Sequence, residues 1–306
     1  MVALRLTKIS LSLLLMAAGL VWADTPSPSP AAADTAKQLP QIDVHARKTL
    51  ERSLDSYLYK VTHTSVAIDD VPLVQWSGPI CPLVTGLPHD LGQGLFDDFT
   101  QALDSLDRPR GPEGCKPNFI IIAMSHPQER LREWGHRHAA PFSYYEGGID
   151  KFLNTTDAVR VWYNNRDVDF NGAGARDTGE MLLDGIFTGV PGFKGPSNGN
   201  SPRFTYIVTP RLKNVIVVVD LEKIVGYAIA PLAEYIAMAG LTQVDLDASY
   251  GETPTILRLF SVADKDRPEG LSTWDRSFIK AVYATDQRSR MQRVAVVQHM
   301  LADLSH

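Results

Sequence analysis

Oxygen-bearing side chains alternate along one short polar segment of the chain. Asp167, Asp169 and Asn171 are separated by single residues, and Gly172 follows them. This spacing reproduces the first half of a calcium-binding loop, in which alternate residues supply oxygen ligands and a glycine allows a sharp bend. The bidentate glutamate of such a loop is missing, because Thr178 stands at the twelfth position. The segment therefore predicts a weak structural calcium site, with a polar turn as the alternative.

Three histidines and one serine stand in patterns that other proteins use for chemistry. His136 and His138, with His126 ten residues earlier, could align on a strand, but no carboxylate lies between them. A solvated basic patch is the simpler interpretation. Ser197 lies in a GxSxG pattern, whose nucleophile belongs between a strand and a helix, whereas glycine and proline precede this serine. A loop is expected there, so we predict neither a metal centre nor a serine hydrolase from these residues.

A glutamate and a glycine stand at the spacing of a zinc-protease helix. In the HExxHxxGxxH pattern two histidines bind zinc, the glutamate deprotonates a bound water, and the glycine lets the chain turn toward a third histidine. Glu234 and Gly240 keep their positions, whereas Ala233, Ala237 and Gln243 replace the three histidines. Because alanine cannot bind zinc, no zinc is expected, and Glu234 is either a vestigial general base or a solvent-facing helix residue. The segment itself is either an amphipathic helix in a core or the helix of a zincin-like fold without its metal.

Two further segments resemble the matrixin-type metzincins. Residues 271–283 begin with Leu-Ser, carry Asp275, and continue as an apolar helix to Tyr283, like the C-terminal helix of that family. Residues 254–257 stand where the family has its Ser-Ile-Met turn, although the methionine is absent. The resemblance covers residues 203–285 and implies a zincin-like domain without its metal site. The whole chain also looks like a group of exported bacterial proteins, a likeness that implies no activity.

Periodicity in the sequence predicts the elements around these residues. Helices are expected at 47–61, 95–106, 222–240 (interrupted by Pro231) and from Ser272 onward, and strands at 118–124, 159–163, 203–208 and 214–220. The last two strands are close enough in sequence to form an antiparallel hairpin. We therefore expect an α+β fold, with a mixed sheet and an edge hairpin, followed by a long helix and a C-terminal helix.

The predicted hairpin lies where the metzincin resemblance has the edge strand that pairs with a peptide. Tyr206, Ile207 and Val208 are therefore the candidate peptide-pairing residues. The expected function is that of a non-catalytic zincin-like protein that binds an extended peptide or a cell-envelope partner. One alternative is an envelope hydrolase acting on peptide or glycan through carboxylates such as Glu234 and Asp220. The second is a structural or assembly protein of the envelope.

The N-terminal region indicates export. Arg5 and Lys8 precede an apolar run at 9–21, and small residues follow at the two positions that a signal peptidase reads. Residues 1–23 are therefore expected to be a signal peptide, 24–40 a Pro/Ser/Ala-rich linker, and 41–306 a single domain. The expected location is the periplasm or the exterior. In such a compartment Cys81 and Cys115 are expected to form a disulfide.

Composition excludes several classes of protein. The chain has 306 residues, of which 44% are hydrophobic and 21% charged, as in ordinary globular proteins. Its formal net charge of −5 argues against a general nucleic-acid binder. The apolar run at 9–21 is too short to be a membrane anchor, so no transmembrane segment is expected after signal cleavage.

Overall fold

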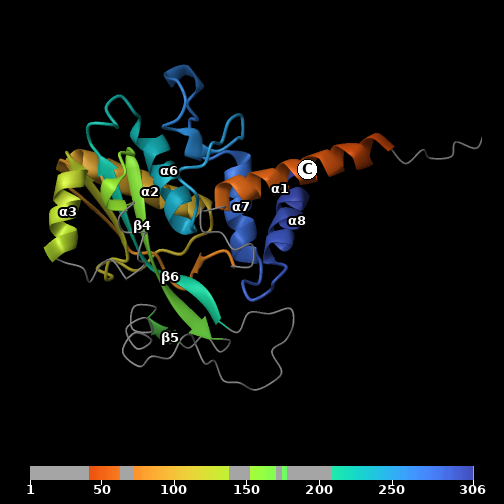
Figure 1. Ribbon diagram of the computed structural model, residues 1–306, viewed down its shortest axis with the longest axis horizontal. Coiled ribbons are helices and arrows are strands. Elements are labelled where there is room, and N and C mark those ends of the chain that lie inside the picture. Colours follow the sequence, from red (N-terminus) through yellow and green to blue (C-terminus); the bar gives the residue numbers. More distant parts are fainter. Residues whose placement is uncertain (1–40, 63–71, 138–151, 170–173, 178–207, 306) are drawn as a thin grey trace, which may run out of the picture. The chain divides into compact units, whose positions relative to one another are not determined.

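The computed structural model describes residues 41–62, 72–137, 152–169, 174–177 and 208–305 (Figure 1). The described residues from Ile42 onward belong to one compact unit. The predicted signal peptide and linker, at 1–23 and 24–40, lie outside the described residues.

A mixed β-sheet forms the centre of this unit. Its strands are β1 (Gln75–Trp76), β2 (Pro82–Thr85), β3 (Phe119–Met124), β4 (Val159–Asp169), β5 (Gly174–Asp177) and β6 (Val208–Asp220). Their order is β2-β3-β6-β4-β5, and β1 pairs with the first part of β6. Strands β1, β2, β3 and β6 run parallel to one another, whereas β4 runs antiparallel to both β6 and β5. The predicted α+β class with a mixed sheet is thus confirmed.

Helices pack on both faces of the sheet. They are α1 (Gln41–Thr62), α2 (His89–Ser105), α3 (Pro127–Arg137), α6 (Ile229–Leu241), α7 (Thr273–Ala284) and α8 (Gln292–Leu304), with 3-10 turns η1 (Ile256–Arg258) and η2 (Asp264–Asp266). Figure 1 shows α3 on one side of the sheet and α2 with α6 on the other. Alternation along β6 explains the two layers, because successive side chains of a strand point to opposite faces. Val215, Val217 and Val219 join the main core, whereas Ile216 and Val218 pack with Leu131 of α3.

Helix α1 uses the apolar face that its periodicity predicted. Leu54, Leu58 and Val61 are buried in the main core. Two side-chain hydrogen bonds join α1 to α8, from Arg293 Nη1 to Thr62 Oγ1 (2.6 Å) and from Gln298 Nε2 to Glu51 Oε1 (2.6 Å). The helix is thereby fixed at both of these points, and its remaining polar face borders the site described below.

The edge hairpin exists, but different residues form it. Strands β4 and β5 make an antiparallel pair at one edge of the sheet. The predicted turn between 208 and 214 is wrong, because Val208–Asp220 is one strand, β6. This strand lies inside the sheet, with β4 on one side and β1 and β3 on the other. Pro210 does not end the strand, because it precedes the part of β6 that pairs with β3, which begins at Val215, and its missing N–H therefore costs no hydrogen bond to β3.

Two helix predictions also need correction. The helix predicted at 222–240 begins seven residues later, at Ile229, and Pro231 lies in its first turn, where its missing N–H costs no helical hydrogen bond. Helices α3 and α8 were not predicted at all. None of the described helices combines the length and apolar character needed to cross a membrane.

Candidate functional site

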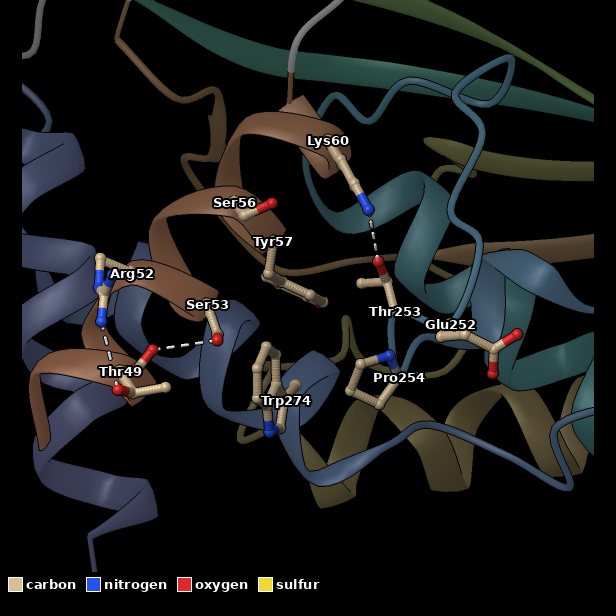
Figure 2. A pocket seen from close by; sticks show the side chains of 10 residues that line it. All are labelled: Thr49, Arg52, Ser53, Ser56, Tyr57, Lys60, Glu252, Thr253, Pro254 and Trp274. Atoms are coloured by element: carbon tan, nitrogen blue, oxygen red, sulfur yellow. Dashed lines mark hydrogen bonds between the residues drawn. The ribbon is translucent and has the colours of Figure 1, made fainter. Parts of the chain in front are cut away.

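A pocket of about 490 Å³ lies between α1 and the segment that leads into α7 (Figure 2). One wall is a face of α1, made of Thr49, Arg52, Ser53, Ser56, Tyr57 and Lys60. The opposite wall comes from residues 252–254 and from Trp274 in the first turn of α7. The α1 residues recur at intervals of three and four, so one side of a single helix presents them all.

The floor of the pocket is aromatic. The rings of Tyr57 and Trp274 meet edge to face, with centroids 5.6 Å apart and planes inclined by 73°. Tyr57 is buried and Trp274 is half-buried, so the indole retains an accessible part. Figure 2 shows Pro254 beside these two rings, across from the hydroxyl groups of α1. The pocket thus combines an apolar floor with a polar helical wall.

A buried carboxylate holds this floor in place. Asp275 is completely buried, and its Oδ1 accepts a hydrogen bond from the Tyr57 hydroxyl at 2.7 Å. Its Oδ2 accepts from the backbone N–H groups of Ile256 (2.8 Å) and Ser272 (2.9 Å). Ser272 Oγ in turn accepts from Asp275 N–H, which completes a capping box at the start of α7. One side chain therefore ties α1, η1 and α7 together.

Burial also governs the ionisation of this network. Desolvation raises the pKa of Asp275, although its hydrogen bonds with the Thr255 side chain, Ile256, Tyr57 and Ser272 act in the opposite direction. Desolvation raises the pKa of the Tyr57 phenol well above its ordinary value, and the neighbouring Asp275 adds to this effect. Tyr57 is therefore a neutral donor at physiological pH.

Two cations border the pocket without an acidic partner. Arg52 donates to Lys48 O (3.3 Å) and Thr49 Oγ1 (3.3 Å), both on its own helix. Lys60 donates to Thr253 Oγ1 (3.0 Å) and more weakly to Tyr250 O (3.5 Å). Among the described residues, neither cation forms an ion pair with a carboxylate. Their donors reach only neutral groups, so the pocket is lined by two cations outside any ion pair and by one carboxylate, that of Glu252.

Three acids belong to the same segments as the pocket, but none of them is paired with Arg52 or Lys60 in the part of the chain that the structure describes. Glu252 lines the pocket at its outer end, and Figure 2 shows its carboxylate directed away from Tyr57 and Trp274. Glu51 and Asp55 of α1 are not among the lining residues, and Glu51 instead accepts from Gln298 of α8. The electrostatics of the pocket thus favour a ligand with negative charge.

Glu234, the candidate general base, has a structural environment. Its Oε1 accepts from Arg276 Nη2 at 3.1 Å, and its Oε2 accepts from Leu271 N–H. Arg276 Nη1 also donates to Ser105 Oγ at 2.8 Å. Glu234 is thus largely covered, and it joins α6 to the start of α7 and, through Arg276, to the end of α2.

Two of the three positions at which the zinc-protease pattern has histidines lie inside the core, whereas the third, Gln243, is half-buried. Ala233 and Ala237 are both 0% exposed. Gly240 lies where α6 approaches β3 so closely that an added Cβ would overlap the Phe119 ring. Its carbonyl accepts from Trp76 Nε1 at 3.0 Å. This part of the helix therefore serves packing, and Gly240 is needed for a close contact.

The remaining candidates from the sequence are scattered. Val208 begins the interior strand β6 opposite Asp169 of β4, while Tyr206 and Ile207 lie outside the described residues. Asp167 and Asp169 are in β4 and Asn171 is outside the described residues, so the calcium site stays a prediction. Asp220 is buried at the end of β6 and accepts from Glu222 N–H (3.1 Å).

Of the three histidines, only His126 has a described side chain. It is exposed, and its Nε2 lies 3.0 Å from Glu222 Oε1. His136 is in α3, His138 lies outside the described residues, and so does Ser197 with its GxSxG pattern. Within the described ranges, no three His, Cys, Asp or Glu side chains gather as a metal site would require.

The disulfide prediction is confirmed. Cys81 and Cys115 are bonded, with their Cα atoms 6.1 Å apart. The bridge closes the segment that contains β2 and α2, because Cys81 directly precedes β2 and Cys115 precedes β3. Asn118 Oδ1 accepts from Cys81 N–H at 2.7 Å, which adds a hydrogen bond at the same point.

The sequence analysis does not predict the pocket. Its helical wall leaves a signal, since hydroxyl and cationic residues recur at helical spacing on α1 beside the apolar face. Its opposite wall leaves no signal in the sequence, because residues 252–254 and Trp274 follow about 200 positions later and meet α1 only through the tertiary fold.

No protein-family model, curated protein or solved structure matches the chain.

Proposed function

We propose that this chain is an exported, non-catalytic binding protein of zincin-like construction, and that it holds an extended peptide in the pocket between α1 and α7. One observation carries the proposal: Arg52 and Lys60 border an aromatic floor without carboxylate partners. A bound acidic group would supply the missing charge, and charge-assisted hydrogen bonds of this kind are stronger than neutral ones. The α1 hydroxyls offer further donors and acceptors to a peptide backbone.

The zincin-like part of the proposal has support of its own. The described chain passes from α6 to a turn at 254–257 and then to α7, which is the last part of the order that the metzincin resemblance implies, although the single strand β6 stands where the resemblance has a hairpin. Asp275 binds the N–H of Ile256 within that turn, so the last helix holds the turn in place. The disulfide Cys81–Cys115 fits an oxidising compartment and therefore supports export.

The hydrogen-bond partners of three acidic residues support the non-catalytic part of the proposal. Glu234 is bound to Arg276 and to a backbone N–H, and Asp275 accepts three hydrogen bonds. Asp220 is buried and caps the turn that follows β6. These carboxylates have structural partners, so they offer little support for the alternative of a hydrolase that works through Glu234 and Asp220.

The test is selection of peptides by the purified protein. The immobilised protein is panned against a random decapeptide library, in parallel with an R52Q/K60Q variant. The matched control is R130Q/K265Q, which removes one arginine and one lysine from exposed positions outside the pocket. We expect acidic peptides to be enriched on the wild type and on the control, but not on the pocket variant.

Two results would contradict the proposal. Equal enrichment on the R52Q/K60Q variant would show that the peptides bind outside the pocket. Absence of enrichment on the wild type would show that the protein does not bind peptides. Enriched peptides are also incubated with the protein and analysed by mass spectrometry, where we expect intact peptides, and cleavage products would overturn the non-catalytic assignment.

A further inference from the structure

We infer that three arginines around residues 75–77 bind a phosphate group, at a site separate from the pocket. The arginines are Arg108, which follows α2, Arg166 of β4 and Arg211 of β6. None of the three lines the pocket between α1 and α7. The inference therefore goes beyond the proposed function and does not depend on it.

Two of the arginines are neighbours in the sheet and contact the same segment. Arg166 of β4 is the register partner of Arg211 of β6, and Arg211 is in turn the register partner of Gln75 of β1. Arg211 Nη1 donates to Gln75 Oε1 at 2.7 Å, and Arg166 Nη2 donates to Ser77 Oγ at 3.4 Å. Like charges at opposite positions of two strands destabilise the pair. A bound anion would offset this repulsion.

The third arginine reaches the segment through an aromatic ring. Trp76 N–H donates to the Tyr283 hydroxyl at 3.3 Å, and Arg108 Cζ lies 3.8 Å from the centre of the Tyr283 ring. Burial raises the pKa of the Tyr283 phenol, and the charges of Arg108 and Arg211 act in the opposite direction. Both cations are therefore close enough to affect the same phenol, which places Arg108 in one cluster with Arg211.

The cluster keeps donors that a ligand could use. Arg108 donates to Leu106 O from Nε (3.0 Å), and Arg166 Nε is buried without a hydrogen-bond partner in the described chain. Among the described residues, none of the three arginines forms an ion pair. No described atom lies within 4 Å of a Cβ added at Gly78, so the surface next to this segment is open.

The acids near the cluster leave it positively charged. There are three of them, and each has a partner. The partners are Arg288 for Asp286 (3.1 Å), Lys280 for Asp107 (3.6 Å) and, as the opposite residue in the sheet, Arg166 for Asp177. Even when Asp177 is counted against Arg166, the three arginines retain two positive charges.

The number and type of these cations favour phosphate over carboxylate. A carboxylate has one charge and two oxygens, whereas a phosphate monoester carries about −1.5 to −2 at neutral pH and has three terminal oxygens. Guanidinium groups bind such oxygens through pairs of parallel N–H donors. Burial lowers the pKa of Arg108 and of Arg211, so both groups are partly shielded from water, where charge-assisted hydrogen bonds are stronger.

The experiment is a calorimetric titration of the complete protein with inorganic phosphate, at constant ionic strength in chloride. We expect R108Q/R166Q/R211Q to lower the affinity for phosphate at least tenfold. The matched control is R110Q, which removes an exposed arginine that is paired with Asp104 (2.9 Å) and should change the affinity less than twofold. Acetate at the same concentrations should not bind.

A conservative variant separates binding from folding. R211K keeps the charge but loses the planar pair of donors, so the affinity for phosphate should fall at least threefold while the melting temperature stays unchanged. Thermal unfolding of each variant checks that the fold is retained. The R52Q/K60Q variant should bind phosphate like the wild type, because its changes lie in the pocket.

Two further probes identify the source of the phosphate. Glycerol phosphate represents a soluble ester, and phosphatidylcholine vesicles that contain phosphatidic acid represent a lipid headgroup. Binding of either probe that is lost in R108Q/R166Q/R211Q supports the inference and assigns its source. Absence of binding to phosphate, to the ester and to the vesicles would overturn it. Binding that survives the triple replacement, or equal binding of acetate, would also overturn it, and neither result would affect the proposed peptide pocket.

Discussion

Asp275 is an acid whose burial gives it a structural role. A carboxylate without solvent contact costs several kcal/mol unless its oxygens are hydrogen-bonded. Here three donors, from Tyr57, Ile256 and Ser272, surround it. The sequence could identify Asp275 as part of a helix start signal, and that prediction is confirmed by the capping box. It could not identify Tyr57, which comes from α1, 218 positions earlier.

Replacing Asp275 tests how strongly this junction depends on it. D275A leaves the Tyr57 hydroxyl and two backbone donors without acceptors in a buried site, so we expect a loss of about 3–5 kcal/mol in the free energy of unfolding. Urea denaturation monitored by tryptophan fluorescence measures this loss. The control D303A changes an exposed aspartate of α8 and should shift stability by less than about 0.5 kcal/mol. A similarly small effect of D275A would show that the junction does not need the carboxylate.

Glu234 allows a chemical role to be separated from a structural one. In E234A the N–H of Leu271 loses its acceptor and Arg276 loses its ion-pair partner, so we expect the free energy of unfolding to fall by about 1–3 kcal/mol. Peptide affinity should not change, because Glu234 does not line the pocket. Denaturation and calorimetry measure the two quantities, with the exposed E129A of α3 as the control. Loss of peptide binding with unchanged stability would return Glu234 to a functional role.

Among the elements, the contact between α6 and β3 shows that a residue of a sequence pattern can have a packing role that the pattern does not report. Gly240 matches the glycine of the zinc-protease pattern. Its observed role is to let α6 approach the ring of Phe119. Phe119 is itself fully buried, stacks with Trp76 and packs against the tilted ring of Phe99. A pattern within one helix cannot predict the contact with the Phe119 ring, because Phe119 belongs to a strand 121 positions earlier.

A pair of glycine replacements measures this contact. G240A forces the Phe119 ring to move within a packed core, so we expect a destabilisation of about 1–3 kcal/mol. G94A lies in α2, where the nearest heavy atom to an added Cβ is 3.9 Å away, so we expect a gain of about 0.5–1 kcal/mol. Thermal and urea unfolding of both variants give the difference. A neutral G240A would mean that α6 can shift away from the sheet.

The elements that the sequence predicted best are those with a local cause. The buried strand β3, the apolar face of α1 and the start of α7 each follow from periodicity or a capping signal within one segment. The errors have non-local causes. Strand β6 continues through Pro210 because β4 pairs with it along almost its whole length. The pairing of β4 with β6 cannot be predicted from either segment alone. The candidate site is also non-local, which is why only its α1 wall left a signal.

The disulfide stabilises the crossover that links β2 to β3. Cys81 and Cys115 are 34 positions apart, and a closed loop of this size contributes roughly 3–4 kcal/mol on the chain-entropy account. We expect the double variant C81A/C115A to lose about this much in the free energy of unfolding. Dithiothreitol should lower the stability of the wild type toward that of the variant and leave the variant unchanged. Equal stability of both proteins without reductant would show that native contacts already hold the loop.

At the scale of the whole molecule, the acids and the cations have separate roles. The carboxylates of Glu234 and Asp275 lie at the junctions that join α6, η1 and α7, whereas Arg52 and Lys60 of α1 line a pocket. Binding without turnover remains our proposal for the complete protein, and it is tested on the complete protein.

The metal content and proteolytic activity of the complete protein test this expectation together. The protein, purified without chelator, is analysed by elemental mass spectrometry for zinc and calcium and is incubated with an unfolded protein substrate. We expect less than stoichiometric zinc and no cleavage, because alanine occupies the two ligand positions on α6 and both side chains are fully buried. Stoichiometric zinc with chelator-sensitive cleavage would contradict the ligand argument and direct mutagenesis to His126, His136 and His138. Calcium alone, with a chelator lowering the melting temperature, would instead support the structural site predicted at Asp167, Asp169 and Asn171, and it would leave the binding function unaffected.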